Sequence, residues 1–201
     1  MKRTLAALSL CVLVASACSP TKTDVRSVTE PTEPVRRVVV LPFNDERVPT
    51  EVRDKAYYGS TREPEAGARV SDAFASALVR QDVYEVLHGR ELAVESRRRG
   101  IHIDELHELP PKEVAEHMNA DAVVVGEVYA MSQGWVLLVS VAQVRFRARC
   151  IDARTGGRIW EAEGRGRNWF NMEYGHAVAA SDRIAERLAQ GDLGSGLLPL
   201  P

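Results

Sequence analysis

A strict alternation of residue types over residues 136–150 constrains the fold more than any other feature of the chain. The even positions of this stretch hold apolar or small residues. From position 143 onward the odd positions hold polar residues, namely Gln143, Arg145, Arg147 and Arg149. A period of two is typical of a β-strand that has one buried and one solvated face. We therefore predict a long strand whose arginines face solvent.

A glycine-rich turn and a second strand at residues 159–163 follow this alternation directly. A hairpin centred on the turn places Arg149 opposite Glu161 and Arg147 opposite Glu163. Opposite charges across strands contribute about 0.2–1 kcal/mol per pair, so we expect these pairs to fix the register more than the stability. We favour this pairing over a nucleic-acid or phosphate site as the explanation of the arginine row.

Strand and helix patterns alternate along the rest of residues 37–191. Runs of β-branched residues at 38–41 and 123–125 are typical of strands buried on both faces, and a short strand is predicted at 83–87. Residues 44–66 carry many charges and no clear period, which is typical of a functional or disordered loop. Apolar residues with helical spacing predict helices at residues 69–80, 90–99, 110–118 and 177–188.

The expected order of elements is strand–helix–strand–helix–helix–strand–strand–strand–helix. Strands separated by helices are typically parallel, whereas strands joined by a tight hairpin are antiparallel. The sequence thus predicts a single α/β domain, in which a mixed β-sheet of about five strands has helices packed on it.

The amino terminus has the pattern of a secretion signal. Lys2 and Arg3 give it positive charge, and residues 5–17 form an apolar stretch. As a helix this stretch is about 20 Å long, which is too short for the roughly 30 Å hydrocarbon core of a membrane. We therefore expect a signal peptide at residues 1–17 that is removed from the mature protein.

The small residues before Cys18 are similar to the lipobox of bacterial lipoproteins, in which the Cys is acylated and becomes the first mature residue. Ala15 stands where that motif prefers Leu, and ordinary cleavage after Ala17 is the alternative. We predict that lipid on Cys18 anchors the protein to a membrane without a membrane-spanning helix. By the sorting pattern of such lipoproteins, Ser19 after the Cys implies the outer membrane, with the domain facing the periplasm.

Residues 18–36 are predicted to form the lipidated Cys and a flexible tether, because they are polar, contain three prolines and show no hydrophobic period. Such a tether reaches at most about 60 Å, so we expect the domain to work at some distance from the membrane. Residues 37–191 would then be the folded domain and residues 192–201 a carboxy-terminal tail.

The net charge argues against one class of partner, and the number of cysteines argues against a disulfide within the mature chain. The chain has 26 basic and 28 acidic residues, so its formal net charge is −2, and loss of Lys2 and Arg3 with the leader makes it −4. This balance argues against a nucleic-acid partner. With Cys11 removed and Cys18 acylated, no disulfide within the mature chain is expected, and Cys150 is predicted to be a buried, inert thiol.

The sequence holds no motif that we can assign to catalysis, a metal or a cofactor. His102 and His107 lack the spacing that puts two imidazoles on one helical face. Residues 113–117 come near an inverted zincin motif but have Glu in place of its first His, and residues 164–166 lack the third glycine of a dinucleotide loop. We therefore expect no enzyme, no metal and no cofactor. An enzyme with an unfamiliar site is a further hypothesis that no motif supports.

Arginine and aromatic residues gather after the hairpin. Arg, Trp and Tyr are the residues that anchor many protein interfaces. An alternative role for Trp169 and Phe170 is to cover one end of the sheet. Together with two tyrosines of the first long loop, these residues form the candidate partner surface: Tyr57, Tyr58, Arg165, Arg167, Trp169, Phe170 and Tyr174.

Five segments of the chain, each of them strand or turn chemistry, occur in a specific order behind the lipobox. They are residues 39–43 (VVLPF), 70–78 (VSDAFASAL), 84–92 (YEVLHGREL), 120–128 (ADAVVVGEV) and 151–160 (IDARTGGRIW). In this order they resemble the family of bacterial envelope lipoproteins that includes the curli secretion channel CsgG and the TolB amino-terminal-like domains. The resemblance covers about residues 37–190.

The resemblance implies an envelope lipoprotein that binds partners or assembles, with no enzymatic activity and no cofactor. CsgG-like members form rings whose extra hairpins line an outer-membrane pore, whereas LpoB-like members are monomeric periplasmic adaptors. This chain offers one long hairpin where the channel contributes two. We therefore favour a non-enzymatic interaction or assembly module of a cell-envelope machine, with an envelope protein as its partner. The alternative is a homo-oligomeric, CsgG-like secretion channel.

Overall fold

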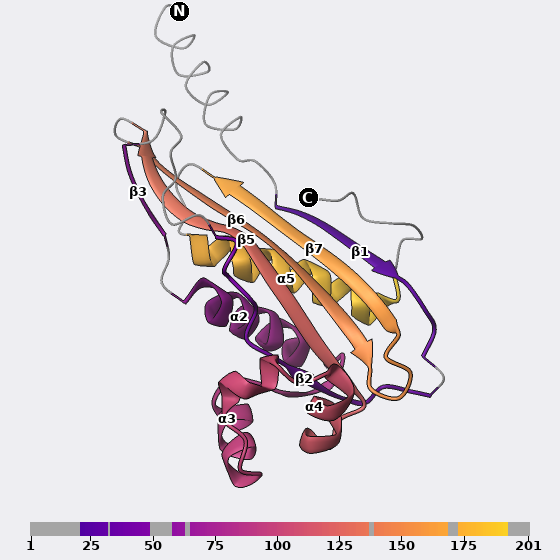
Figure 1. The fold of residues 1–201 in the computed structure, drawn as a ribbon. Coiled ribbons are helices and arrows are strands. Elements are labelled where there is room, and N and C mark those ends of the chain that lie inside the picture. Colours follow the sequence, from indigo (N-terminus) through magenta and orange to yellow (C-terminus); the bar gives the residue numbers. More distant parts are fainter. Residues whose placement is uncertain are drawn as a thin grey trace, which may run out of the picture.

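In a computed structural model, the chain forms one mixed β-sheet with helices on both of its faces (Figure 1). The structure describes residues 21–31, 33–48, 58–62, 65–136, 139–168 and 173–192. The strands are β1 (Lys22–Ser27), β2 (Arg37–Val40), β3 (Tyr58–Arg62), β4 (Glu85–Leu87), β5 (Ala122–Val136), β6 (Val139–Asp152) and β7 (Arg158–Asn168). The helices are α2 (Ala66–Arg80), α3 (Gly89–Arg98), the 3₁₀ turn η1 (Ile103–His107), α4 (Pro111–Met118) and α5 (Glu173–Gln190).

The described strands lie side by side in the order β1-β7-β6-β5-β2-β4, and β3 pairs with the far part of β5. β2 runs parallel to its two neighbours, β4 and β5, while the remaining pairs are antiparallel. The predicted α/β fold with a mixed sheet is confirmed. The sheet is wider than the five strands expected, because β1 and β3 join it.

Helices α2 and α5 cover one face of the sheet. Beneath them the ring of Phe74 lies 6.2 Å from that of Phe146 and 6.0 Å from that of Trp160, measured between centroids. All three side chains are fully buried. Because Phe146 and Trp160 occupy the apolar positions of the two long strands, the alternation read from the sequence fixes which face receives the helices.

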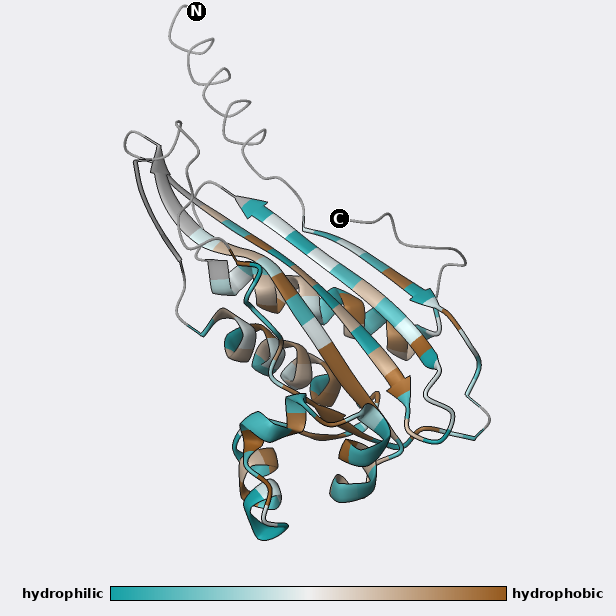
Figure 2. Cartoon of the chain, in the orientation of Figure 1, coloured by the Kyte–Doolittle hydropathy of each residue, from teal (hydrophilic) through white to brown (hydrophobic). Residues whose placement is uncertain are grey.

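The other face of the sheet is covered at one end by α3, η1 and α4. There Leu92, Leu106 and Val114 pack against Val39 and Val123 in a second apolar cluster. Figure 2 shows this end of β5 as strongly apolar, whereas β7 and β1 alternate between polar and apolar residues toward the other end. No described helix lies over that second part of the face (Figure 1).

The predicted hairpin has the predicted register. In the β6–β7 pair, Arg149 lies opposite Glu161 and Arg147 lies opposite Glu163. The tight turn between the strands is closed by Asp152, whose Oδ1 accepts hydrogen bonds from the backbone N–H groups of Arg154 and Thr155.

The predicted tether is wrong over residues 22–27, which form strand β1 and pair with β7 along six residues. Its single apolar residue, Val25, is fully buried in the main core. Arg183 and Arg187 of α5 donate to the backbone carbonyls of Thr21 and Thr23 and so hold the strand from the helix side. Because β1 has only one apolar residue, its sequence shows no hydrophobic period. Its place in the sheet is fixed mainly by its pairing with β7.

The structure describes part of the long charged segment between β2 and α2. Residues 58–62 of this segment form β3, which pairs with β5 at Trp135, Gln133 and Ser132, whereas residues 49–57 lie outside the described residues.

None of the described helices is long and apolar enough to cross a membrane. The predicted signal peptide, the lipidated Cys18 and residues 193–201 also lie outside the described residues.

Candidate functional site

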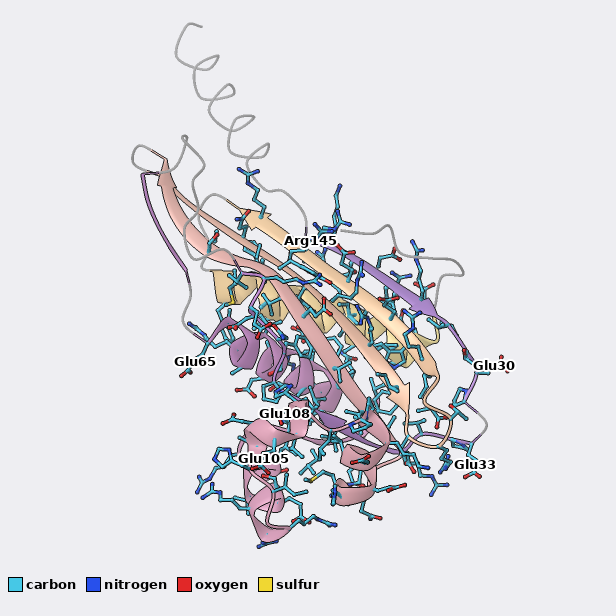
Figure 3. All side chains as sticks on the ribbon, viewed as in Figure 1. Glu30, Glu33, Glu65, Glu105, Glu108 and Arg145 are labelled. Carbon is cyan, nitrogen blue, oxygen red and sulfur yellow. The ribbon has the colours of Figure 1, made fainter. Side chains whose placement is uncertain are left out.

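The side of the sheet turned away from α2 and α5 carries a band of charged residues on β1, β5, β6 and β7. We call the part of this side that α3, η1 and α4 leave uncovered the open face. On β6 and β7 it contains the five residues of a charged ladder: Arg145, Arg147, Arg149, Glu161 and Glu163. Figure 3 shows Arg145 on this face, in the half of the sheet away from α3.

Glu163 is the centre of the ladder. Its Oε1 lies 3.0 Å from Nε of Arg145 and 2.8 Å from Nε of Arg165. A terminal nitrogen of Arg147 lies 3.7 Å from Oε2. The Glu163 side chain is 2% exposed, so three guanidinium groups surround a carboxylate that is almost entirely removed from water.

Glu161 has the same arrangement one step along the strand. Its Oε1 lies 3.2 Å from Nε of Arg149 and 3.5 Å from Nε of Arg147. Arg158 approaches its other oxygen at 3.3 Å. Two glutamates are thus shared by five arginines, and Arg147 joins both halves because it contacts each carboxylate.

A bulge in β5 adds an aromatic ring to the ladder. The register between β5 and β6 shifts between Val128 and Ala130, which makes Tyr129 the extra residue. The guanidinium carbons of Arg145 and Arg147 lie 5.7 and 6.0 Å from the Tyr129 ring centroid, within cation–π range. The Tyr129 hydroxyl donates to Oε2 of Glu127 at 2.7 Å, and burial together with this carboxylate raises the pKa of Tyr129.

The prediction that the arginines are solvated is wrong for the middle of the ladder. The Arg147 side chain is 7% exposed, and the two glutamates beside it are also buried. Arg147 and both carboxylates are thus removed from water by their neighbours in the ladder, although no described helix lies above them. Arg145 and Arg165 at one end are 32% and 49% exposed, so the buried centre passes into an accessible, positively charged end.

Two pockets open on this side of the sheet. The first, of about 430 Å³, lies between β1, β5, β6 and β7 and is lined mainly by polar and basic residues: Lys22, Tyr129, Gln143, Arg145, Arg165 and Arg167. The second, of about 220 Å³, lies where η1 and α4 meet the sheet and has a more apolar rim, with Leu41, Leu106, Leu109, Glu127 and Arg149 among its residues.

The chemistry of the open face is that of recognition. Guanidinium groups offer fixed N–H donors that suit carboxylate and phosphate oxygens. Among the described residues, no three His, Cys, Asp or Glu side chains are grouped so that they could hold a metal ion.

Cys150 is confirmed as a buried free thiol under α2 and α5, and burial raises its pKa far above the ordinary value.

The structure describes the side chains of three of the seven residues of the predicted partner surface. Arg165 and Arg167 lie on the open face and line the first pocket. Tyr174 belongs to α5, in the layer on the opposite side of the sheet, where the Arg69 guanidinium carbon lies 5.0 Å from its ring centroid. Residues Tyr57, Trp169 and Phe170, and the side chain of Tyr58, lie outside the described residues. Arg165 and Arg167 therefore lie on the other side of the sheet from Tyr174, and for the other four residues the partner surface stays a prediction.

The sequence pattern of the GNA1162-like lipoproteins matches residues 77–180, which is just over half of the chain. This range runs from the end of α2 through the ladder to the first turns of α5. The chain belongs to the GNA1162-like lipoprotein family. The expected relation to envelope lipoproteins is thus supported, and the family is more specific than the CsgG and TolB resemblance. No curated protein matches the chain.

Solved structures with the same fold include the lipoprotein GNA1162 from Neisseria meningitidis, which is 18% identical with a TM-score of 0.56 and covers 77% of this chain and 99% of its own. A dodecamer of a PelC variant from Paraburkholderia phytofirmans is 19% identical with a TM-score of 0.54 and covers 84% and 99%. A second PelC dodecamer structure from the same organism is 19% identical to this chain, with a TM-score of 0.52. These likenesses show the fold.

Sequence reasoning missed the residues that complete the site, namely Lys22, Glu127 and Tyr129. Lys22 lay in the expected tether, and neither the bulge at Tyr129 nor its approach to the arginines leaves a periodic signal. The arginine row itself was recognised and explained by pairing with glutamates. Five arginines of β6 and β7 share only the two glutamates of β7. This excess of arginines can be read from the sequence, and it indicates that these pairs do not neutralise all of the positive charge.

The ladder predicts a large stability loss for Glu163→Gln. The variant leaves three guanidinium groups, one of them buried, without their shared carboxylate, and the free energy of unfolding should fall by about 3 kcal/mol. Urea denaturation measures this loss. The matched control is Glu186→Gln on the exposed side of α5, which contacts Gln190 and should change stability by less than about 0.5 kcal/mol. Equal effects of the two variants would contradict a structural role for the ladder.

Proposed function

We propose that this chain is an outer-membrane lipoprotein, anchored by lipid on Cys18 and facing the periplasm, that acts as a non-enzymatic interaction module of a cell-envelope assembly. The observation that carries the proposal is the open face, because a part of the sheet that is rich in Arg, contains Tyr129 and has no covering helix among the described residues is suited to a partner. Membership of a lipoprotein family supports the anchoring part.

The two ends of this side suit different tasks. At the α4 end the second pocket combines leucine side chains with Arg149 and Glu127. Interfaces commonly have an apolar centre with polar groups that fix orientation, so this pocket is the proposed docking point for the envelope protein partner. The basic first pocket lies at the other end, where β1 begins.

A second candidate function is a subunit of an oligomeric assembly, in its strongest form a CsgG-like secretion channel. The observation in its favour is the fold shared with PelC, whose solved structures are dodecamers. Rings arise when one surface of a subunit binds a different surface of the next. The same second pocket could then receive another copy of this chain.

Lipidation predicts a mass difference that depends on one residue. The mature protein isolated from membranes should begin at Cys18 and carry the mass of the added acyl groups, and Cys18→Ala should remove that mass and the membrane attachment. Intact-mass spectrometry of membrane and soluble fractions measures both. Cys150→Ala is the matched control, because the buried Cys150 should not be acylated. Unchanged mass in Cys18→Ala would contradict the anchor.

The docking pocket predicts a position-specific cross-link. A photo-cross-linking amino acid at Leu109, on the rim of the second pocket, should give one discrete adduct in intact cells. The same group at Val79 of α2, which is 51% exposed in the opposite layer, is the control and should give none. An adduct with a different envelope protein supports the module, and an adduct of twice the chain mass supports the oligomer. Identical patterns at both positions would contradict docking at this pocket.

A further inference from the structure

The first pocket contains an arrangement of charge that the fold by itself does not explain. In the β1–β7–β6 register, Lys22 lies opposite Arg165, and Arg165 lies opposite Arg145. Three positive side chains thus stand in one row across three strands. Like charges directly opposite each other destabilise a sheet, so such a row is unfavourable unless negative charge offsets it.

Glu163 offsets this charge in part. Its Oε1 receives the Nε groups of Arg145 and Arg165 at 3.0 and 2.8 Å. Each guanidinium has five N–H groups, and this contact uses the Nε group of each. Arg167 adds a fourth positive charge to the same pocket, next to Gln143 in the register. Four cations thus line the pocket, two of which share the buried carboxylate of Glu163, and such a basic lining is suited to an anion.

The position of Lys22 limits what that anion is. Residues Cys18 and Lys22 are four positions apart, so their Cα atoms are at most about 14 Å apart even in a fully extended chain. Lys22 cannot move away from the pocket, because β1 is paired with β7 over six residues. This step rests on the proposed lipidation of Cys18. With that anchor, the pocket lies close to the lipid headgroups.

The charge of the opposite end agrees with this orientation. Residues 89–118, which span α3, η1 and α4, carry seven acidic and five basic side chains, so their formal net charge is −2. Figure 3 shows Glu105, in η1, and Glu108, directly after η1, in the lower half of the molecule, below Arg145. An anionic surface attracts basic groups and repels acidic ones, which turns the β1 end toward the membrane.

We propose that the pocket lined by Lys22, Arg145, Arg165 and Arg167 binds the phosphate headgroup of an anionic membrane lipid. Guanidinium and ammonium groups bind phosphate through charge-assisted hydrogen bonds. The lipid anchor then holds the chain at the membrane, and the pocket fixes which face of the domain is turned to the bilayer.

The test separates the pocket from the anchor. The protein is the mature chain from residue 18 with Cys18→Ser, which contains every described residue. It is sedimented with phosphatidylcholine vesicles that contain, or lack, about one-third phosphatidylglycerol. We expect binding to the anionic vesicles, weakened by salt. Lys22→Gln combined with Arg167→Gln should weaken this binding about 30-fold.

The matched control is Arg90→Gln combined with Arg98→Gln, which removes the same charge from exposed positions on α3 and should change binding less than twofold. Equal binding to both vesicle types, or equal loss in both double variants, would overturn the proposal. Thermal stabilisation by inorganic phosphate without vesicle binding would overturn the membrane as the source of the anion. Lipid-free oligomers that depend on Lys22 and Arg167 would show instead that a second copy occupies the pocket. The mass of the acylated protein reports on the anchor independently.

Discussion

The pairing of Arg147 with both Glu161 and Glu163 is the interaction on which the open face depends. Each carboxylate is surrounded by three guanidinium groups, and Arg147 belongs to both sets. Two buried carboxylates would be costly without these partners, and the arginines would repel one another without the carboxylates. The ladder therefore fixes the β6–β7 register and leaves the arginines at its margins in defined positions.

The ladder also explains how part of one side of the sheet can do without a covering helix among the described residues. On the other side, Phe74, Phe146 and Trp160 form an apolar core that requires α2 and α5 as a cover. On the open face, charge-assisted contacts between arginines and glutamates take the place of apolar packing. A surface of this kind is stable in water and still able to exchange some of its contacts for those of a partner or a ligand.

Much of the fold was predictable from the sequence because the two long strands have a clear period and their charges match across a tight turn. The same period led to the error about solvation. An alternation of apolar and charged residues says which side of a strand each residue occupies, but it does not say how many arginines share one carboxylate. Tyr129 joined the ladder through a bulge that only the pairing of β5 with β6 shows. β1 was missed because Val25 is its single apolar residue, so the strand leaves no hydrophobic period in the sequence.

In the proposed orientation, the basic end of the open face lies against the membrane while the α3 end points away. The most direct test places a fluorophore at Gln143→Cys, in the first pocket, or at Val94→Cys on α3, in the lipidated protein on vesicles with a quencher attached to the lipid headgroups. We expect strong quenching at residue 143 and little at residue 94. Equal quenching at the two positions, or stronger quenching at residue 94, would contradict it.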